Sequence, residues 1–241
     1  MRILVVRHAE PDYENDSLTD KGWREAEYLA DRLSREKIDY FYVSPMGRAQ
    51  ATASCTLKKM KREAVTLDWL KEFHVPVIHP GDTLPTRPWD WIPSTWVADE
   101  RFFDKDHWTE NPAFEAVDLK EKYDHVVSCF DELLASHGYQ RNGYVYDAIC
   151  SNHDTIALFC HFGLECVLLS HLLNVSPMVL WHGFCAAPSS VTTIYTEERE
   201  KGTASFRISS FGDISHLYVH GEKPSFMARY CECFDDPVRH D

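Results

Sequence analysis

Short apolar runs alternate along this chain with stretches whose apolar residues recur at helical spacing, and this alternation constrains the fold more than any other feature. Residues 3–6 form a continuous apolar run, as expected of a strand that is covered on both faces. After a polar loop, residues 18–37 carry apolar side chains every three or four positions, and Thr19 stands where a helix N-cap is expected. The chain therefore begins with a strand followed by a helix.

The same pairing returns further along the chain. The pattern predicts strands at 39–44, 65–73 (running into a loop), 155–161, 191–195 and 204–209, and helices at 45–60, 123–134 and 163–174. We expect the last two strands to be antiparallel to each other at an edge. Alternating strands and helices with short polar turns predict an α/β fold, a three-layer sandwich with a mostly parallel central sheet.

Residues 74–112 break this alternation. Prolines and tryptophans are interspersed through them without a helical or a strand period, and the segment is too aromatic for a disordered linker. We expect a cap inserted at about 74–112 into a single domain that spans residues 1–241. We expect its tryptophans to pack the cap onto itself and onto the sheet, the alternative being that they bind a leaving group. Four cations are candidates for binding a second anion: Arg87, Arg101, Lys105 and His107.

The charge of the chain excludes some classes of partner. Asp and Glu number 38 against 25 Lys and Arg, so the formal net charge is −13. A general nucleic-acid or anionic-membrane surface needs a positive field, so we expect neither partner. The chain has no apolar run as long as a signal-peptide core or a membrane span, and its eight cysteines do not resemble a secreted disulfide framework. These features predict a reduced, cytoplasmic protein.

Polar and cationic side chains gather where the predicted strands end. Arg7 and His8 follow the first strand, Arg48 stands four residues after the second, and His161 ends a third. Ligands of parallel α/β sheets bind beyond the carboxyl ends of the strands. The sequence therefore predicts a local positive cluster that captures an anion against the overall charge. The alternative for Arg48 is an ordinary salt bridge on a helix surface.

A metal site is the weaker interpretation of this region. Cys150, His153, Cys160 and His161 suggest zinc, but their spacing matches none of the usual two-pair patterns. Side chains 160 and 161 would also point to opposite faces of a strand. We therefore expect no metal and no cofactor.

Five motifs, in order and spacing, resemble the histidine phosphatase superfamily, and most closely its phosphoglycerate-mutase-like branch. They are RHAE at 7–10, LTDKG at 18–22, SPMGRAQATA at 44–53, LKE at 70–72 and CHFG at 160–163. The likeness covers most of residues 1–72 and about 150–195. In two places the chain departs from the pattern: Ala9 replaces a glycine where the backbone is expected to approach phosphate, and Phe162 separates His161 from Gly163.

The chemistry of phosphoryl transfer assigns the same roles to these residues as the family resemblance does. It needs a nucleophile in line with the leaving oxygen, positive groups around the phosphoryl oxygens and an acid for the departing alkoxide. His8 is the expected nucleophile, because nearby cations lower the pKa of an imidazole and keep it neutral. Arg7, Arg48 and His161 are the expected phosphate-binding residues.

The proton donor is less well defined by the sequence. Glu72 matches the family position L-x-E just before the 74–112 segment, so the resemblance implies that it is the general acid. Four other carboxyl groups are rivals: Glu10, Asp12, Asp99 and Glu100.

The sequence as a whole predicts a metal-independent phosphatase that hydrolyses a phosphate monoester through a phosphohistidine on His8. The alternatives are phosphoglycerate-mutase-type transfer and a family member that binds a phosphorylated ligand without turnover. We expect a small phosphorylated molecule as the partner. The oligomeric state stays open, a homodimer included.

Overall fold

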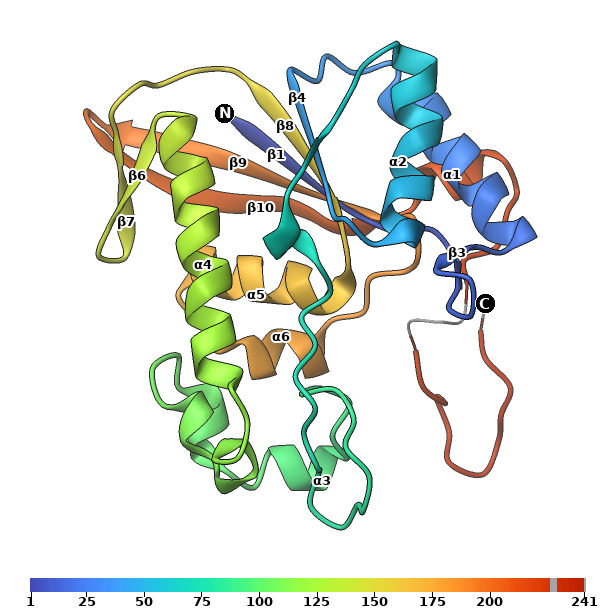
Figure 1. The fold of residues 1–241 in the computed structure, drawn as a ribbon, viewed down its shortest axis with the longest axis vertical. Coiled ribbons are helices and arrows are strands. Elements are labelled where there is room, and N and C mark those ends of the chain that lie inside the picture. Colours follow the sequence, from blue (N-terminus) through green and yellow to red (C-terminus); the bar gives the residue numbers. More distant parts are fainter. Residues whose placement is uncertain (226–228, 241) are drawn as a thin grey trace.

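The computed structural model describes residues 1–225 and 229–240. Its strands are β1 (Arg2–Arg7), β2 (Pro11–Asp12), β3 (Ser17–Leu18), β4 (Tyr40–Val43), β5 (Val65–Thr66), β6 (Tyr139–Asn142), β7 (Val145–Ala148), β8 (Thr155–Cys160), β9 (Val191–Glu200) and β10 (Thr203–Asp213). Eight of them form one sheet in the order β5-β4-β8-β1-β9-β10-β7-β6, and β2 pairs with β3 (Figure 1).

The sheet has a parallel half and an antiparallel half. Strands β5, β4, β8 and β1 run parallel to one another, whereas β9, β10, β7 and β6 continue as antiparallel neighbours. The parallel half contains the strands predicted to end in polar residues, so their carboxyl ends point the same way. Strands β9 and β10 are antiparallel as predicted, but they lie inside the sheet rather than at its edge. The edge strand of the antiparallel half is β6, which forms a hairpin with β7 that the sequence pattern did not predict.

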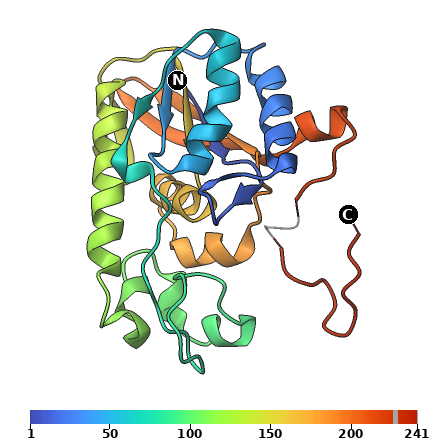
Figure 2. The same ribbon diagram turned by 45° about the vertical axis from the view of Figure 1, so that its right-hand side comes forward.

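Helices cover both faces of this sheet (Figures 1 and 2). They are α1 (Asp20–Leu33), α2 (Gly47–Met60), α3 (Pro93–Trp96), α4 (Leu119–Ser136), α5 (Phe162–Leu173), α6 (Pro177–Gly183) and α7 (Ser215–Val219), with 3₁₀ turns at Asp68–Leu70, Glu100–Phe103, Trp108–Glu110 and Pro112–Phe114. Helices α1, α2 and α7 lie on one face, and α4, α5 and α6 on the other. The predicted three-layer α/β architecture is confirmed.

The residues of β1 explain why both faces are covered. Leu4 and Val6 pack into one hydrophobic cluster with residues of α1 and α2, and Ile3 and Val5 pack into another with residues of α4, α5 and α6. All four side chains are at most 2% exposed. Because strand side chains alternate between faces, an uninterrupted apolar run requires apolar layers on both sides.

Segment 74–112 is irregular, with a single bridge between Val77 and Thr86, the short helix α3 and 3₁₀ turns. Its tryptophans are nevertheless ordered by packing. Trp91 contacts Phe102 edge-on, with ring centroids 5.1 Å apart, and Trp108 lies 5.7 Å from Trp181 of α6. The packing of Trp91 and Trp108 agrees with the expectation, whereas Trp89 both packs against Trp181 and lines a cavity. Among the described residues, no helix combines the length and the apolar character needed to cross a membrane.

Candidate active site

Two histidines from neighbouring parallel strands meet at the carboxyl edge of the sheet. Arg7 of β1 stands opposite Cys160 of β8, so the residues that follow them, His8 and His161, lie side by side. Their ring centroids are 5.1 Å apart and the rings are inclined by 58°. Both histidines are buried, with 2% and 0% of their surfaces exposed. The predicted convergence of strand ends is therefore present for this pair.

The backbone fixes the tautomer of His8. Nδ1 lies 2.8 Å from the carbonyl oxygen of Ala9, and because a carbonyl only accepts, Nδ1 must carry the proton. The other ring nitrogen, Nε2, then keeps a lone pair. Burial lowers the pKa of His8 well below its ordinary value, and Arg7 and Arg48 lower it further against the opposing effect of the Ala9 carbonyl. A neutral imidazole with a free Nε2 can act as a nucleophile.

The methyl group of Ala9 does not line the cavity next to His8. It packs in a small cluster with Leu18 and Ala26, while the backbone N–H of Ala9 donates to Thr52 Oγ1 at 2.9 Å. The side chain points toward α1 and α2, away from the cavity that His8 lines.

Arg7 is held on the opposite side of the sheet from Ala9. Its guanidinium lies 5.8 Å from the centre of the Phe162 ring and donates to the carbonyl oxygen of Ala186. Only 6% of the residue is exposed, which is consistent with a fixed orientation. Phe162, which interrupts the family pattern after His161, therefore supports the arginine and lines the cavity instead of closing it.

Arg48 is oriented by an acid that sequence reasoning missed. Asp16 Oδ1 accepts from Arg48 at 2.8 Å, and Asp16 Oδ2 accepts from the backbone N–H of Gly47 at 2.6 Å. Arg48 therefore does form a salt bridge, as the alternative interpretation expected. However, the arginine is 7% exposed and lines the same cavity as Arg7 and His8. One ion pair at Nη1 leaves other guanidinium donors available.

His161 makes a side-chain hydrogen bond through one of its ring nitrogens. Nε2 lies 2.9 Å from Ser44 Oγ, and Nδ1 has no hydrogen-bond partner among the described residues. Burial lowers the pKa of His161 well below its ordinary value, and His8, Arg48 and Arg7 add to that effect. His161 is therefore a neutral ring beside His8, held by Ser44, which follows β4. It is fully buried and is not among the described residues that line the cavity.

Glu72 lies at the N-terminus of α5 and lines the cavity. Its Oε1 accepts backbone N–H groups from Phe73 at 2.8 Å and from Leu164 at 2.9 Å. Burial raises the pKa of this carboxyl, and that effect outweighs the lowering by the backbone donors and Arg7. A carboxyl with a raised pKa has the property that a general acid needs.

The rival carboxyl groups are placed elsewhere. Glu10 accepts from the Thr19 hydroxyl at 2.8 Å, and Asp12 accepts from Asn15 in an exposed turn. Asp99 pairs with Arg101 in segment 74–112. None of these acids, nor Glu100, is among the described residues that line the cavity.

Gly163 leaves space that the site requires. A Cβ atom at this position would lie 2.2 Å from Cη2 of Trp89 and 2.7 Å from Oε1 of Glu72. Both distances are far shorter than ordinary contacts. The glycine therefore allows segment 74–112 and the carboxyl of Glu72 to approach the first turn of α5.

The cavity measures about 660 Å³, which leaves room beyond a phosphoryl group for the rest of a substrate. In addition to Arg7, His8, Arg48, Glu72 and Phe162, it is lined by Tyr13, His74, Pro85, Thr86, Arg87, Trp89, Asp90, Ala186, Arg229 and Tyr230. Sequence reasoning missed Asp90, Arg229 and Tyr230. No periodicity or motif marks them, since they come from irregular segments.

Of the four cations expected to be candidates for a second anion, only Arg87 lines the cavity. Arg101 pairs with Asp99, Lys105 with Asp106 and His107 with Asp104, all within segment 74–112. For those three the expectation is wrong. Within residues 1–225 and 229–240, no three His, Cys, Asp or Glu side chains form a group able to hold a metal ion.

Comparisons with known proteins agree with this architecture. A family model described as "Histidine phosphatase superfamily (branch 1)" matches residues 3–208. Phosphoserine phosphatase 1 of Hydrogenobacter thermophilus is 24% identical over 236 residues, which cover 92% of this chain and 99% of that protein. A 2,3-bisphosphoglycerate-dependent phosphoglycerate mutase of Thermoplasma acidophilum is 34% identical over 73 residues, covering 26% of this chain and 36% of the mutase.

Solved structures show the same fold. A phosphoserine phosphatase of Entamoeba histolytica, an H9A mutant in complex with phosphoserine, has a TM-score of 0.57 at 17% identity and covers 90% of this chain and 98% of its own. A mycobacterial glucosyl-3-phosphoglycerate phosphatase has a TM-score of 0.57 at 17% identity and covers 88% and 98%.

Proposed function

Because this chain belongs to the histidine phosphatase superfamily, branch 1, we propose that it hydrolyses a phosphate monoester through a phosphohistidine on His8. One observation carries the proposal. A buried, neutral His8 keeps its Nε2 lone pair free in a cavity that Arg7 and Arg48 also line. Few functions other than attack on an anionic centre need an uncharged imidazole between two arginines.

In the first step, Arg7, Arg48 and His161 bind the phosphoryl oxygens. His8 Nε2 attacks phosphorus, and the bond from phosphorus to the leaving oxygen breaks as the new P–N bond forms. The two guanidinium groups meet the charge on the phosphoryl oxygens, so the proposal includes no metal. Nδ1 stays bonded to the Ala9 carbonyl, which stabilises the positive ring that forms.

Glu72 supplies the proton that the leaving oxygen needs. Its raised pKa supports this role, because the carboxyl must be protonated when the alcohol departs. In the second step the resulting carboxylate takes a proton from water, and the water oxygen attacks phosphorus. The P–N bond then breaks, inorganic phosphate leaves, and both His8 and Glu72 return to their starting states.

The second candidate is phosphoryl transfer between positions of a phosphoglycerate. The likeness to the Thermoplasma mutase favours it, although it covers only 26% of this chain. A mutase would isomerise 2-phosphoglycerate and 3-phosphoglycerate rapidly and hydrolyse them slowly. The two solved structures described above are phosphatases by name, which is why hydrolysis is our first proposal.

The test is release of phosphate from p-nitrophenyl phosphate in the presence of EDTA. We expect activity in the wild type and its loss to background in His8→Ala, with phosphoserine and 3-phosphoglycerate as first candidates for the natural substrate. His125→Ala is the matched control, because His125 is exposed on α4 and lines no part of the cavity. Full activity in His8→Ala, or loss with EDTA that added metal restores, would contradict the proposal.

A further inference from the structure

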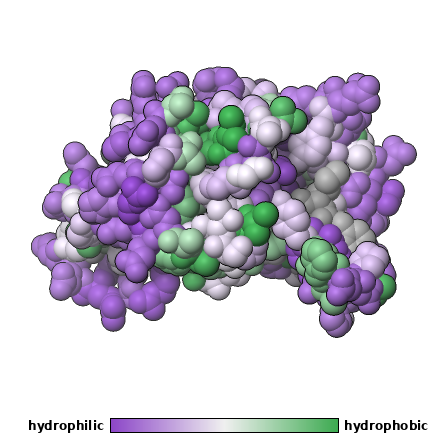
Figure 3. Space-filling model, turned by 90° about the horizontal axis from the view of Figure 1, so that it is seen from below, coloured by the Kyte–Doolittle hydropathy of each residue, from purple (hydrophilic) through white to green (hydrophobic). Residues whose placement is uncertain are grey.

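The far end of the cavity is built from two irregular segments of the chain. Arg87 and Asp90 come from segment 74–112, and Arg229 and Tyr230 come from the C-terminal segment, residues 220–225 and 229–240. The family model ends at residue 208, so the C-terminal contribution lies outside the part of the chain that defines the family. In Figure 3, which views this end of the molecule, hydrophobic residues form small separate patches among polar ones.

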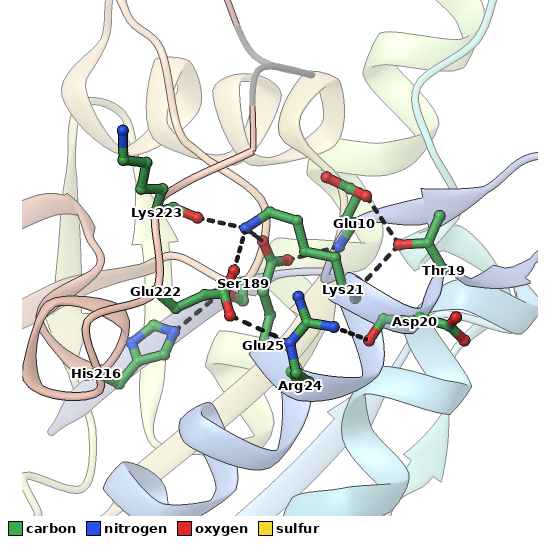
Figure 4. A network of polar contacts seen from close by, with 11 residues as sticks. Glu10, Thr19, Asp20, Lys21, Arg24, Glu25, Ser189, His216, Glu222 and Lys223 are labelled. Carbon is green, nitrogen blue, oxygen red and sulfur yellow. Dashed lines mark hydrogen bonds and ion pairs between the residues drawn. The ribbon is translucent and has the colours of Figure 1, made fainter. Parts of the chain in front are cut away.

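The start of the C-terminal segment is anchored to α1. Glu222 Oε1 lies 2.7 Å from Lys21 Nζ, and Glu222 Oε2 lies 3.2 Å from Arg24 Nε. Lys21 also donates to the carbonyl oxygen of Lys223, and Figure 4 shows its ammonium between these groups and Glu25. These contacts fix where the segment leaves α7.

Neighbouring side chains orient the guanidinium of Arg87. Its Nε lies 2.5 Å from Asp90 Oδ2, and Tyr230 lines the same part of the cavity as these two residues. Burial and the Asp90 charge raise the pKa of Tyr230 to about 12, so its hydroxyl remains a donor at neutral pH. A guanidinium has five N–H donors, and the Asp90 contact at Nε engages one side of it.

Positive charge exceeds what the phosphoryl group alone requires. Four arginines but only two acids, Glu72 and Asp90, line the cavity, in a chain whose net charge is −13. Arg7 and Arg48 are already assigned to the phosphoryl oxygens. The other two, Arg87 and Arg229, line the part of the cavity that is left for the leaving group of a monoester. Arg229 also lies near an acid, since its Nη1 is 3.7 Å from Glu232 Oε1.

We propose that Arg87 and Arg229 form a second anion subsite, which binds an acidic group on the alcohol part of the substrate. The inference rests on the proposed function and adds the substrate class to it. The substrates are phosphate monoesters whose alcohol carries a carboxylate or a second phosphate. The ion pair with Asp90 holds Arg87 in place, and guanidinium groups match the geometry of both kinds of anion.

Three small esters separate the two kinds of anion. Glycerol 3-phosphate has no second anion, 3-phosphoglycerate has a carboxylate, and propane-1,3-diol bisphosphate has a second phosphate. We expect the wild type to prefer one acidic ester over glycerol 3-phosphate by about ten- to a hundredfold in kcat/KM, the effect of one or two charged hydrogen bonds. The preferred ester identifies the group that the subsite binds.

Arg87→Gln and Arg229→Gln should each reduce this preference, and together they should abolish it. Arg101→Gln is the matched control, since Arg101 belongs to segment 74–112 but pairs with Asp99 and lines no part of the cavity. It should leave the preference unchanged. Equal losses on all three esters in the Arg87 and Arg229 variants, or no loss, would overturn the subsite.

Binding to the His8→Ala protein gives a readout that does not depend on turnover. Calorimetry should show tighter binding of the preferred acidic ester than of glycerol 3-phosphate, and Arg87→Gln in that background should cancel the difference. Equal affinities would overturn the subsite even if the wild type is an active phosphatase. Selective binding by a wild type that hydrolyses nothing would support the subsite and overturn the proposed hydrolysis instead.

Discussion

Replacement of Gly163 by alanine tests how closely the active site is packed around α5. The added Cβ would lie 2.2 Å from Trp89 Cη2 and 2.7 Å from Glu72 Oε1. Carbon atoms in contact are normally separated by about 3.5–4.0 Å, so the tryptophan ring must move by more than about 1 Å. Trp89 is 6% exposed and lies 5.5 Å from the Trp181 ring, which limits that movement.

Two effects of different size follow from this clash. Overpacking of a buried site costs about 1–3 kcal/mol, and alanine in a helix regains about 0.5–1 kcal/mol relative to glycine. We therefore expect Gly163→Ala to lower the free energy of unfolding by about 1–2 kcal/mol. The carboxyl of Glu72 is displaced as well, and a misplacement of about 1 Å can reduce kcat about 100-fold.

Urea unfolding and hydrolysis of an alkyl phosphate measure the two effects separately. Gly183→Ala is the matched control: it is the last residue of α6, and a Cβ there would meet nothing within 4 Å. The control should keep wild-type stability and activity. If Gly163→Ala behaves like Gly183→Ala in both assays, the argument that Gly163 makes room for Trp89 and Glu72 is refuted.

Three further substitutions test separate parts of the site and the fold. Glu72→Gln should lower kcat by about 100- to 1,000-fold for alkyl phosphates, but much less for p-nitrophenyl phosphate, whose leaving group needs no proton; equal losses would exclude a general acid. Asp16→Asn weakens the ion pair that orients Arg48, so the KM for phosphate esters should rise several-fold with little change in stability, and an unchanged KM would argue against that positioning. Burial raises the pKa of Glu25 from 4.5 to about 7, which means that the folded protein holds the Glu25 proton more tightly than the unfolded chain does. The resulting stabilisation of the folded state is complete below about pH 4.5 and is lost as the pH rises through about 7. The unfolding free energy of the wild type should therefore fall by about 3 kcal/mol relative to Glu25→Gln between about pH 5 and pH 8, and parallel pH profiles would contradict the buried-carboxyl argument.

The sequence predicts the core of the site because the rule behind it is geometric. Parallel strands bring their carboxyl ends to one edge of a sheet, so Arg7, His8 and His161 could be placed near one another before their coordinates were known. The α/β layers follow from apolar periodicity in the same way.

The parts that escaped prediction depend on contacts without local signals. Asp16 reaches Arg48 from a loop 32 residues away in sequence, and Arg229 reaches the cavity from a segment that has neither helical nor strand periodicity. The direction of the Ala9 methyl depends on how the chain turns after β1, which a motif does not specify. Hairpin β6–β7 was missed because its strands have only four residues each and few apolar positions.

The central claim of this account is that His8 becomes covalently phosphorylated during turnover. Rapid mixing with p-nitrophenyl phosphate, followed by quenching at neutral to alkaline pH and mass spectrometry of peptides, measures it directly. We predict a transient, acid-labile phosphoryl group on the peptide that contains His8, formed no more slowly than p-nitrophenol is released and absent from His8→Ala. Phosphorylation of a different residue, or steady turnover with His8 unmodified at every time point, would contradict the account.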